Sequence, residues 1–289
     1  MPLANTLDLV REARRAGYAV PAVNVVDGLS LQACVDTAAA IGSPLILQTS
    51  VKTIKVMGSE VLAFLARTAA HRVDVPVALH LDHCRDRRVI TEAIERGWTS
   101  VLFDASDRDL ATARRETAEV VAEAHAAGVT VESEIENIVG VEDGVGGDEL
   151  EHAYSIDTLV EVALETGTDL IAPQLGTAHG LYAAEPVLRV DRVVELQART
   201  DTPVVLHGGT GLSEADFGAF IDAGISKINI STALKIAYLQ ACHAHLEKAA
   251  ATSSWEPVAM FADVTRAVHG VIDEHARLFG SAGRVGSAA

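Results

Sequence analysis

The chain of 289 residues carries 23 Lys and Arg against 40 Asp and Glu, a formal net charge of −17 at pH 7. A surface this acidic repels phosphate backbones and anionic lipids, so the composition argues against nucleic-acid and membrane-surface binding. No apolar run approaches the roughly 20 residues that span a bilayer, and residues 1–15 lack a signal-peptide pattern. The cysteines, Cys34, Cys84 and Cys242, are odd in number and widely spaced, which predicts a reduced, cytoplasmic protein.

Short β-branched runs alternate with longer Ala-rich amphipathic stretches along the chain. Residues 1–17 have the pattern of a helix. Eight strand-like runs follow, at residues 19–25, 45–48, 77–81, 100–103, 130–135, 169–172, 203–206 and 227–230. Helical patterns lie between them, at residues 29–40, 56–71, 88–96, 110–127, 156–166 and 190–200. Two more helices are expected from about residue 235 onward, with a loose Gly/Ser/Ala tail after residue 279.

The regular alternation of strand and helix is typical of repeated βα units. Eight units predict an α/β fold, a (β/α)₈ TIM barrel, with residues 1–289 as one domain and the extra N-terminal and C-terminal helices packed on it. The alternative is an open doubly wound sheet, which needs a Gly-x-Gly-x-x-Gly turn after the first strand. Residues 26–30 do not contain this motif, so the barrel is favoured.

Polar side chains are concentrated where the predicted strands end, whereas the strand interiors are mostly Val, Ile, Leu and Ala. In a barrel of this kind, the C-terminal strand ends and the loops after them form the active-site face. The residues at these ends are Asn24, Ser50, Asp82, His83, Asp104, Glu132, Glu134, His179 (in the loop after the sixth strand), His207 and Asn229. We therefore expect these side chains to surround one site.

Three of these residues are histidines on different strands or loops: His83, His179 and His207. Three neutral imidazoles that converge on one face make a catalytic zinc site with an open position for substrate. His80 competes with His83 as the ligand, and spacing alone does not choose between them. Cys84 could ligate a soft metal too, although one thiol among imidazoles is more often incidental packing.

A Gly-rich loop follows the seventh strand, and a short loop with two hydroxyl residues follows the eighth. The first contains Gly208, Gly209 and Thr210, and the second leads through Ser231 and Thr232 into a helix. Loops at these two positions of a barrel frequently bind phosphate with the help of a helix N-terminus. Two such loops in the expected places favour phosphate binding over simple tight turns.

A third Gly-rich stretch, residues 140–147, joins the fifth strand to its helix. Its length and glycines suit a mobile lid that carries an acid or a base, either Glu142 or Asp143. The alternative is a solvated acidic loop, and the residues alone leave the two open.

Six motifs together resemble a known family, the class II, zinc-dependent ketose-bisphosphate aldolases, and in particular its fructose- and tagatose-bisphosphate aldolase branch. They run in the family's order and cover most of the chain between Asn24 and Thr232. The motifs are Leu-His-Leu-Asp-His at 79–83, Ser-Val-Leu-Phe-Asp-Ala-Ser at 100–106, Val-Glu-Ser-Glu at 131–134, Gly-Thr-Ala-His-Gly-Leu-Tyr at 176–182, Leu-His-Gly-Gly-Thr-Gly at 206–211 and Lys-Ile-Asn-Ile-Ser-Thr at 227–232. Residues 280–284 are also similar to the C-terminal end of that branch.

The resemblance implies that His83, His179 and His207 are the zinc ligands. Asp104 and Glu134 match acidic residues linked to an alternative zinc position. Cleavage between C3 and C4 leaves negative charge on the ketose oxygens, which a metal ion stabilises as a Lewis acid. The implied cofactor is therefore Zn²⁺, and a monovalent cation, Na⁺ or K⁺, often assists at the phosphate site of the family.

The resemblance also implies two proton-transfer residues and a set of substrate contacts. Asp82 matches the residue that exchanges the proton of the C4 hydroxyl, and Glu142 matches the lid glutamate that moves the proton at C3. The residues that match or adjoin the contacts to the 1-phosphate and the dihydroxyacetone part are Gly180, Gly208, Gly209, Thr210, Asn229, Ser231, Thr232, Asn24 and Ser50. The implied reaction cleaves fructose or tagatose 1,6-bisphosphate to dihydroxyacetone phosphate and an aldehyde.

The chain departs from the family at the distal end of the substrate. Members usually carry an arginine for the distal phosphate in an Asp-Pro-Arg stretch, but residues 253–257 read Ser-Ser-Trp-Glu-Pro and the next arginine is Arg266. A phosphate dianion without a cationic partner is poorly held. A ketose 1-phosphate with another distal end, such as a sulfonated or deoxy-acid sugar, is therefore an alternative substrate.

Three other functions compete with this interpretation. A Schiff-base aldolase needs an activated lysine at a strand end, and Lys227 is expected at the N-terminal end of the last strand, on the wrong face. A metal-dependent hydrolase barrel usually has His-x-His on its first strand, and residues 19–25 contain no histidine. A catalytically inactive barrel that binds sugar phosphates is the third. The exposed Ala/Leu faces expected after Lys235 predict a homo-oligomer, a dimer or a tetramer.

Overall fold

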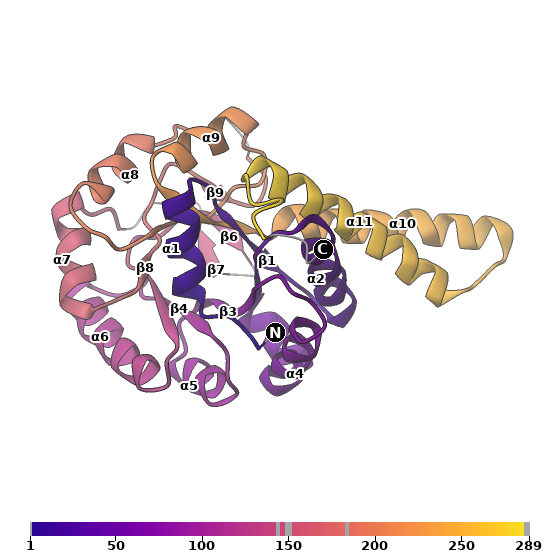
Figure 1. Ribbon diagram of the computed structural model, residues 1–289, viewed down its shortest axis with the longest axis horizontal. Coiled ribbons are helices and arrows are strands. Elements are labelled where there is room, and N and C mark those ends of the chain that lie inside the picture. The colour runs from indigo at the N-terminus through magenta and orange to yellow at the C-terminus, as the bar shows by residue number, and fades with distance from the viewer. Residues whose placement is uncertain (1, 143–144, 148–151, 183–184, 286–289) are drawn as a thin grey trace.

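The computed structural model describes residues 2–142, 145–147, 152–182 and 185–285, and of residues 141, 142 and 145–147 only the backbone. Its centre is a closed barrel of eight parallel strands in the order β1-β2-β3-β4-β5-β8-β10-β11 (Figure 1). The strands are β1 Val20–Asn24, β2 Leu45–Ser50, β3 Val77–Cys84, β4 Ser100–Asp104, β5 Thr130–Glu134, β8 Leu170–Ile171, β10 Val204–Leu206 and β11 Ile225–Ile230. The predicted TIM barrel is confirmed.

Helices surround the barrel, as the periodic apolar faces predict. They are α1 Thr6–Ala16, α2 Gly28–Ile41, α3 Val51–Met57, α4 Ser59–Ala70, α5 Arg87–Glu95, α6 Leu110–Ala126, α7 Ile156–Thr166, α8 Val190–Gln197, α9 Glu214–Asp222, α10 Thr232–Thr252 and α11 Pro257–Leu278. The helix predicted at 56–71 is present as α4 over Ser59–Ala70, but residues 56 and 57 belong to a separate helix, α3. Ser50 caps a helix that begins at Val51, and Gly58, with φ of 87°, separates it from α4.

Alternate residues of each strand face opposite sides, and this period separates two kinds of core. The outward set, such as Leu79, packs under the helices. The inward set at the N-terminal end, such as Ile46 and Ala78, packs with Val10 of α1 into a small apolar plug. This plug closes the N-terminal end of the barrel. The next inward residues along the strands are polar, and they are therefore gathered toward the C-terminal end of the barrel.

A second, smaller sheet is separate from the barrel sheet, and its strands fall inside the ring of helices in the view of Figure 1. Strand β6 Val139–Glu142 pairs antiparallel with β7 Val145–Gly147 and parallel with β9 Ala178–His179. The predicted lid is therefore a hairpin in its described part. His179, predicted in a loop, lies instead on the short strand β9 that this hairpin holds.

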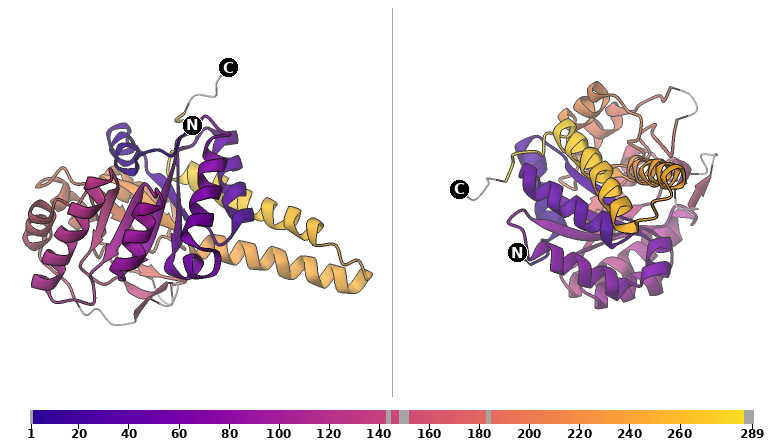
Figure 2. Two further views of the ribbon diagram at one scale, coloured as in Figure 1. Left: turned by 90° about the horizontal axis from the view of Figure 1, so that it is seen from below. Right: turned by 90° about the vertical axis from the view of Figure 1, so that its right-hand side faces the viewer.

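The C-terminal helices α10 and α11 pack against each other and extend away from the barrel as an arm (Figures 1 and 2). The tail predicted to be loose after residue 279 is ordered as far as Val285. The amides of Gly283 and Val285 donate to the carbonyls of Ile41 and Gly42 at 2.8 and 2.9 Å. These hydrogen bonds attach it to the end of α2, so this prediction is wrong for residues 280–285, and residues 286–289 lie outside the described part.

None of the helices in the described residues combines the length and the apolar character needed to cross a bilayer.

Candidate active site

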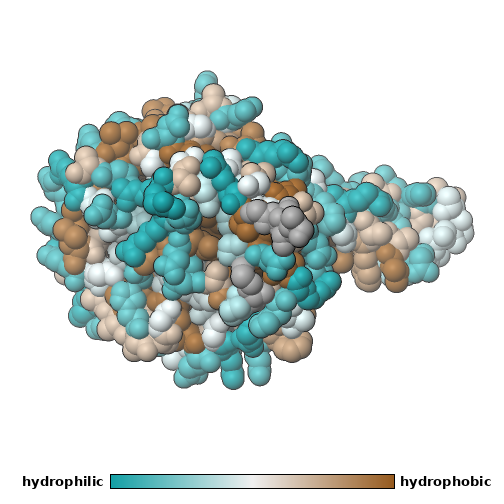
Figure 3. Space-filling view, in the orientation of Figure 1, coloured by the Kyte–Doolittle hydropathy of each residue, from teal (hydrophilic) through white to brown (hydrophobic). Residues whose placement is uncertain are grey.

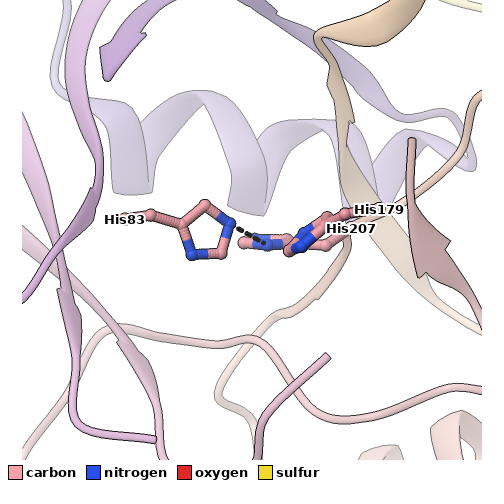
Figure 4. Close-up of side chains that lie close together, drawn as sticks. All are labelled: His83, His179 and His207. Atoms are coloured by element: carbon pink, nitrogen blue, oxygen red, sulfur yellow. Dashed lines mark hydrogen bonds between the residues drawn. The ribbon is translucent and has the colours of Figure 1, made fainter. Parts of the chain in front are cut away.

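Three histidines meet at the C-terminal ends of the barrel strands. His83 lies near the end of β3, His179 on β9, and His207 directly after β10 (Figure 4). The ring centroid of His83 is 4.9 Å from that of His179 and 4.8 Å from that of His207, and Nε2 of His83 is 3.0 Å from Nδ1 of His207. All three side chains are buried, and one ligand nitrogen of each lies within 4.8 Å of the others. Such a group can hold one metal ion.

His83 reaches this position through an unusual backbone. Its φ is 40°, in the left-handed region that residues with a side chain rarely adopt. The pairing of β3 with β4 shifts register between Leu81 and Cys84, around the same residue. A conformation of this kind costs on the order of 1–3 kcal/mol and is found where the surrounding structure enforces it, often at functional sites.

A second potential metal group shares His83. Its Nδ1 lies 3.9 Å from Oδ2 of Asp104 and 3.7 Å from Oε2 of Glu134, at the ends of β4 and β5. Glu134 Oε2 also lies 3.6 Å from Nδ1 of His207 but has no hydrogen-bond donor among the described residues. A buried oxygen in this state is costly unless a cation or a proton meets it.

His207 is oriented by two buried, ion-paired side chains, Glu132 and Lys227. Its Nε2 lies 2.8 Å from Oε1 of Glu132, and Oε2 of Glu132 lies 2.8 Å from Nζ of Lys227. A carboxylate that accepts from Nε2–H leaves Nδ1 to face His83 and a metal ion. His80 lies further from the C-terminal end of β3 than His83, and its Nδ1 is bonded to Ser100 Oγ at 2.8 Å. The structure thus gathers His83, and not His80, with the other two histidines.

Burial sets the protonation of these groups. It lowers the pKa of His179 and His207 well below the usual histidine value, so both imidazoles are neutral and able to bind a metal. Burial also raises the pKa of Glu134 well above its usual value, and Asp104 and Glu132 add to the effect although His83 opposes it. Neutral imidazoles beside carboxylates fit a divalent ion of the zinc type.

Asp82 lies one residue before His83 and is 1% exposed. Burial alone would raise its pKa, but the neighbouring His83, His207 and Lys227 outweigh burial and the pKa is lowered. Asn24 donates through Nδ2 to Oδ2 of Asp82 at 2.7 Å, and Asn229 donates to Oδ1 at 3.3 Å. Asp82 is therefore an ionised, fixed carboxylate, suited to accept a proton.

The loops predicted to bind phosphate meet beside the histidines. Gly208 has φ of 70°, and a Cβ atom there would lie 2.5 Å from the carbonyl oxygen of Ala178, so only glycine permits this close approach. The hydroxyl of Tyr182 donates to the carbonyl of Gly208 at 2.6 Å. Ser231 precedes α10, and its buried Oγ has no hydrogen-bond partner within the described ranges. A helix N-terminus with a hydroxyl in this state suits an anion.

Comparison with known proteins agrees with this geometry. A family model described as class-II fructose-bisphosphate aldolase matches residues 4–284. The chain belongs to this family. It is 36% identical to the D-tagatose-1,6-bisphosphate aldolase subunit GatY of Klebsiella oxytoca over 249 residues, which cover 86% of this chain and 88% of the relative. The class II aldolases are metal-dependent carbon–carbon lyases, and the resemblance seen in the sequence is confirmed.

Solved structures of aldolases share the whole fold. The YdjI aldolase of Escherichia coli K12 superimposes with a TM-score of 0.84 at 29% identity, covering 98% of this chain and 99% of the other. A putative fructose-1,6-bisphosphate aldolase of Coccidioides immitis superimposes with a TM-score of 0.90 at 27% identity, covering 97% and 98%. The barrel, the small sheet and the helical arm together therefore form the architecture of a class II aldolase.

Two further residues of the predicted site, Ser50 and Glu142, lie at the ends of elements of this class II aldolase. Ser50 is the N-cap of α3, where its Oγ accepts from the Thr53 amide. Glu142 ends strand β6, but its side chain, like Asp143 and the rest of the loop to residue 151, lies outside what the structure describes in full.

Lys227 differs from its predicted position. Strand β11 begins two residues earlier than expected, at Ile225, so Lys227 is an inward residue in its middle, with no exposed surface. Its Nζ is held by Glu132 and by Oδ1 of Asn229, each at 2.8 Å. The prediction that it lies on the wrong face is wrong, because the ammonium sits beneath the histidines. The alternation of residues 227–230, in which Ile228 and Ile230 face the helices, could have revealed this.

Proposed function

We propose that the protein is a zinc-dependent aldolase that cleaves a ketose phosphate between C3 and C4. The observation that carries the proposal is the buried group of His83, His179 and His207 with the ionised Asp82 beside it. A metal position and a base at adjoining sites are what a retro-aldol cleavage requires. A binding protein without activity would have no use for a buried carboxylate kept charged by its surroundings.

In the proposed reaction, a zinc ion held by the three histidines would act as a Lewis acid toward the negative charge that develops on the ketose oxygens. Asp82 accepts the proton of the C4 hydroxyl. The C3–C4 bond then breaks, the C4 oxygen forms the carbonyl of the released aldehyde, and the bonding electrons pass to C3 and the C2 oxygen. Glu142 then delivers a proton to C3. Asp104 and Glu134 are proposed as an alternative metal position.

The second part of the proposal assigns the 1-phosphate to the loops after β10 and β11 and to the start of α10, with a monovalent cation, Na⁺ or K⁺, that assists there. The unpartnered Oγ of Ser231 supports this assignment. Asn229 and Asn24, whose amides both touch Asp82, are placed to orient the dihydroxyacetone part. The proposed contacts to substrate are Gly180, Gly208, Gly209, Thr210, Asn229, Ser231, Thr232, Asn24 and Ser50.

Fructose or tagatose 1,6-bisphosphate is the proposed substrate, with dihydroxyacetone phosphate and an aldehyde as products. The name of the tagatose-bisphosphate relative supports it. Residues 253–257, which lead into α11, contain no arginine, and Val258 follows them with 68% of its surface exposed. This lack of a cation favours a second candidate, a ketose 1-phosphate with a non-phosphate distal end such as a sulfonated or deoxy-acid sugar.

The test is a panel of ketose phosphates assayed by release of dihydroxyacetone phosphate from zinc-loaded protein. The panel holds fructose and tagatose 1,6-bisphosphate, fructose 1-phosphate, and 1-phosphates with a sulfonate or carboxylate at the far end. A clear preference in kcat/KM for a 1,6-bisphosphate supports the first candidate, and a preference for another distal group supports the second. No cleavage of any member at verified zinc loading would contradict the proposed function.

The proposal includes a cytoplasmic homo-oligomer. The cysteines Cys34, Cys84 and Cys242 are free, which agrees with a reducing compartment. Apolar side chains exposed on the helical arm support association with further copies of the chain (Figure 3).

A further inference from the structure

The two potential metal groups overlap, and the structure contains a cation that distinguishes them. Both use His83, which faces His207 with Nε2 and the carboxylates with Nδ1. Arg85 lies two residues further along the chain, just after β3 ends, and its guanidinium is directed to Asp104.

Asp104 has both oxygens engaged. Oδ2 accepts from Nε of Arg85 at 2.9 Å, and Oδ1 accepts from the amide and the hydroxyl of Ser106 at 3.0 and 2.6 Å. Nη2 of Arg85 also donates to the Ser106 hydroxyl at 3.0 Å, and Arg108 holds the Arg85 carbonyl at 2.9 Å. A metal ion that took Asp104 would have to share the carboxylate with a charge-assisted hydrogen bond and lie next to the Arg85 guanidinium. Glu134 Oε2, by contrast, has no donor among the described residues.

The charges around the site lead to the same result. Four buried carboxylates surround it in the described part of the chain, and two cations contact them: Arg85 at Asp104 and Lys227 at Glu132. The guanidinium of Arg85 therefore already supplies a positive charge beside the second group of possible ligands. A second divalent ion there would add like charge next to it, which is unfavourable unless Arg85 leaves.

We propose that Arg85 is a positioning residue that occupies the second metal position in place of an ion, so that the chain holds one metal ion, at the three histidines. This inference rests on the proposed function, because it takes the histidines to be ligands. Arg85 would thereby keep the ion on the side of the site that adjoins Asp82 and the loops after β10 and β11.

The experiment measures zinc per chain in the full-length protein. Chelator-stripped protein is reloaded with excess zinc, desalted and analysed by mass spectrometry of the metal. The wild type is expected to retain one ion, and Arg85→Gln a second ion. The double variant Arg85→Gln/Asp104→Asn should return to one, which a general loosening of the fold would not produce. Arg88→Gln, a change to an exposed arginine that pairs with Asp86, serves as the matched control and should retain one ion.

The outcomes separate the two proposals. Wild-type protein that binds no ion contradicts the proposed function itself, whereas metal binding with the same count in wild type and Arg85→Gln contradicts only the role of Arg85. If Arg85→Gln does not fold, cobalt titration of the wild type decides. Absorbance that saturates at one equivalent supports the proposal, and a second equivalent that develops its own ligand-field bands overturns it.

Discussion

The inward residues toward the C-terminal ends of the barrel strands form a connected set of ionisable and amide side chains. Gln48 donates to Asn24, Asn24 donates to Asp82, and Lys227 forms an ion pair with Glu132, each across adjoining or facing strands. Every member limits the rotamers of the next, so the site is fixed before substrate arrives. In a medium of low dielectric constant, such pre-organised groups need little rearrangement during reaction.

Asp82 gives the first prediction at this scale. Asp82→Ala should retain zinc, because the three histidines remain, but kcat should fall on the order of 10²–10⁴-fold through loss of the base. Steady-state kinetics together with the metal content of the same preparation measure both effects. Asp86→Ala, which removes an exposed helix cap four residues away, is the control and should keep kcat. A near-normal kcat in Asp82→Ala would exclude Asp82 from proton transfer.

His80 gives a second prediction, on stability. Its folded-state pKa is lowered well below 6.5, first by burial and then by Lys227, so the unfolded chain binds this proton more readily. Metal-free protein should therefore lose stability as pH falls below about 6.5. His80→Asn, which keeps a partner for Ser100, should reduce the slope by up to about 1.4 kcal/mol per pH unit. Urea unfolding between pH 7.5 and 5 measures it, and parallel pH curves for the two proteins would refute the assignment.

Individual residues were predictable where strand ends mark them. His83, His179 and His207 stand at such ends, and the structure brings them together. Lys227 and Arg85 were not identified as site residues from the sequence. A lysine inside a barrel is recognised only when its strand register is known, and Arg85 acts through Asp104, which is 19 residues away in the chain. Such partners depend on tertiary contacts that spacing does not encode.

Among the elements, the small sheet connects the lid to the histidine site. Strand β6, which ends at Glu142, pairs with β9 so that Gly140 lies opposite His179. Gly140 has φ of 96°, and a Cβ atom there would lie 2.4 Å from the His179 carbonyl oxygen. The hairpin and the histidine strand can therefore approach this closely only with glycine at this position.

Gly140→Ala is the prediction at the element scale. The added methyl should push β6 from β9, displace His179 and Glu142 together, and weaken both zinc binding and turnover. A displacement of about 1 Å can cost on the order of 10²-fold in rate. Gly128→Ala is the matched control, since its φ of 71° is similarly strained but nothing lies within 4 Å of the added atom. Equal kcat and zinc affinity in the two variants would contradict the coupling of lid and histidine.

Element prediction succeeded where period and caps agree. Residues 156–166 were predicted as a helix, and α7 has these bounds, with Ser155 as its cap and Gly167 as its end. The sequence did not reveal β9, because two residues carry no periodic signal and are a strand only through their pairing with β6. It also missed the break at Gly58, where a left-handed φ separates two helices.

The whole molecule is a barrel with one long projection. The arm exposes large apolar side chains on both of its helices and on the turn between them: Leu239, Leu246, Trp255, Val258 and Phe261. A hollow of about 130 Å³ lies among its residues, between Trp255 and Met260. Exposed apolar area of this kind is typical of a surface that meets another protein. The closed barrel was predictable from eight alternating units, but the direction of the arm was not, because it depends on how α10 leaves β11. The organisation of the chain as a single domain stays a prediction.

The prediction at this scale concerns assembly. The wild type should have the mass of an oligomer, and the double variant Trp255→Glu/Phe261→Glu should shift toward the monomer, since charges in an apolar interface are unfavourable. Light scattering after size exclusion measures the mass. Leu164→Glu, an equally exposed leucine on α7 on the side of the barrel away from the arm, is the control (Figure 1). An unchanged mass in the arm variant would show that the arm is not the contact.

The most direct test of the account as a whole follows zinc and cleavage in one preparation. Release of dihydroxyacetone phosphate from the preferred ketose phosphate is measured for protein as loaded, after removal of metal by a chelator, and after stepwise return of zinc. The account predicts that activity disappears with the metal and returns in proportion to zinc bound. Full activity in verified metal-free protein, together with covalent trapping of a lysine by borohydride and substrate, would contradict it.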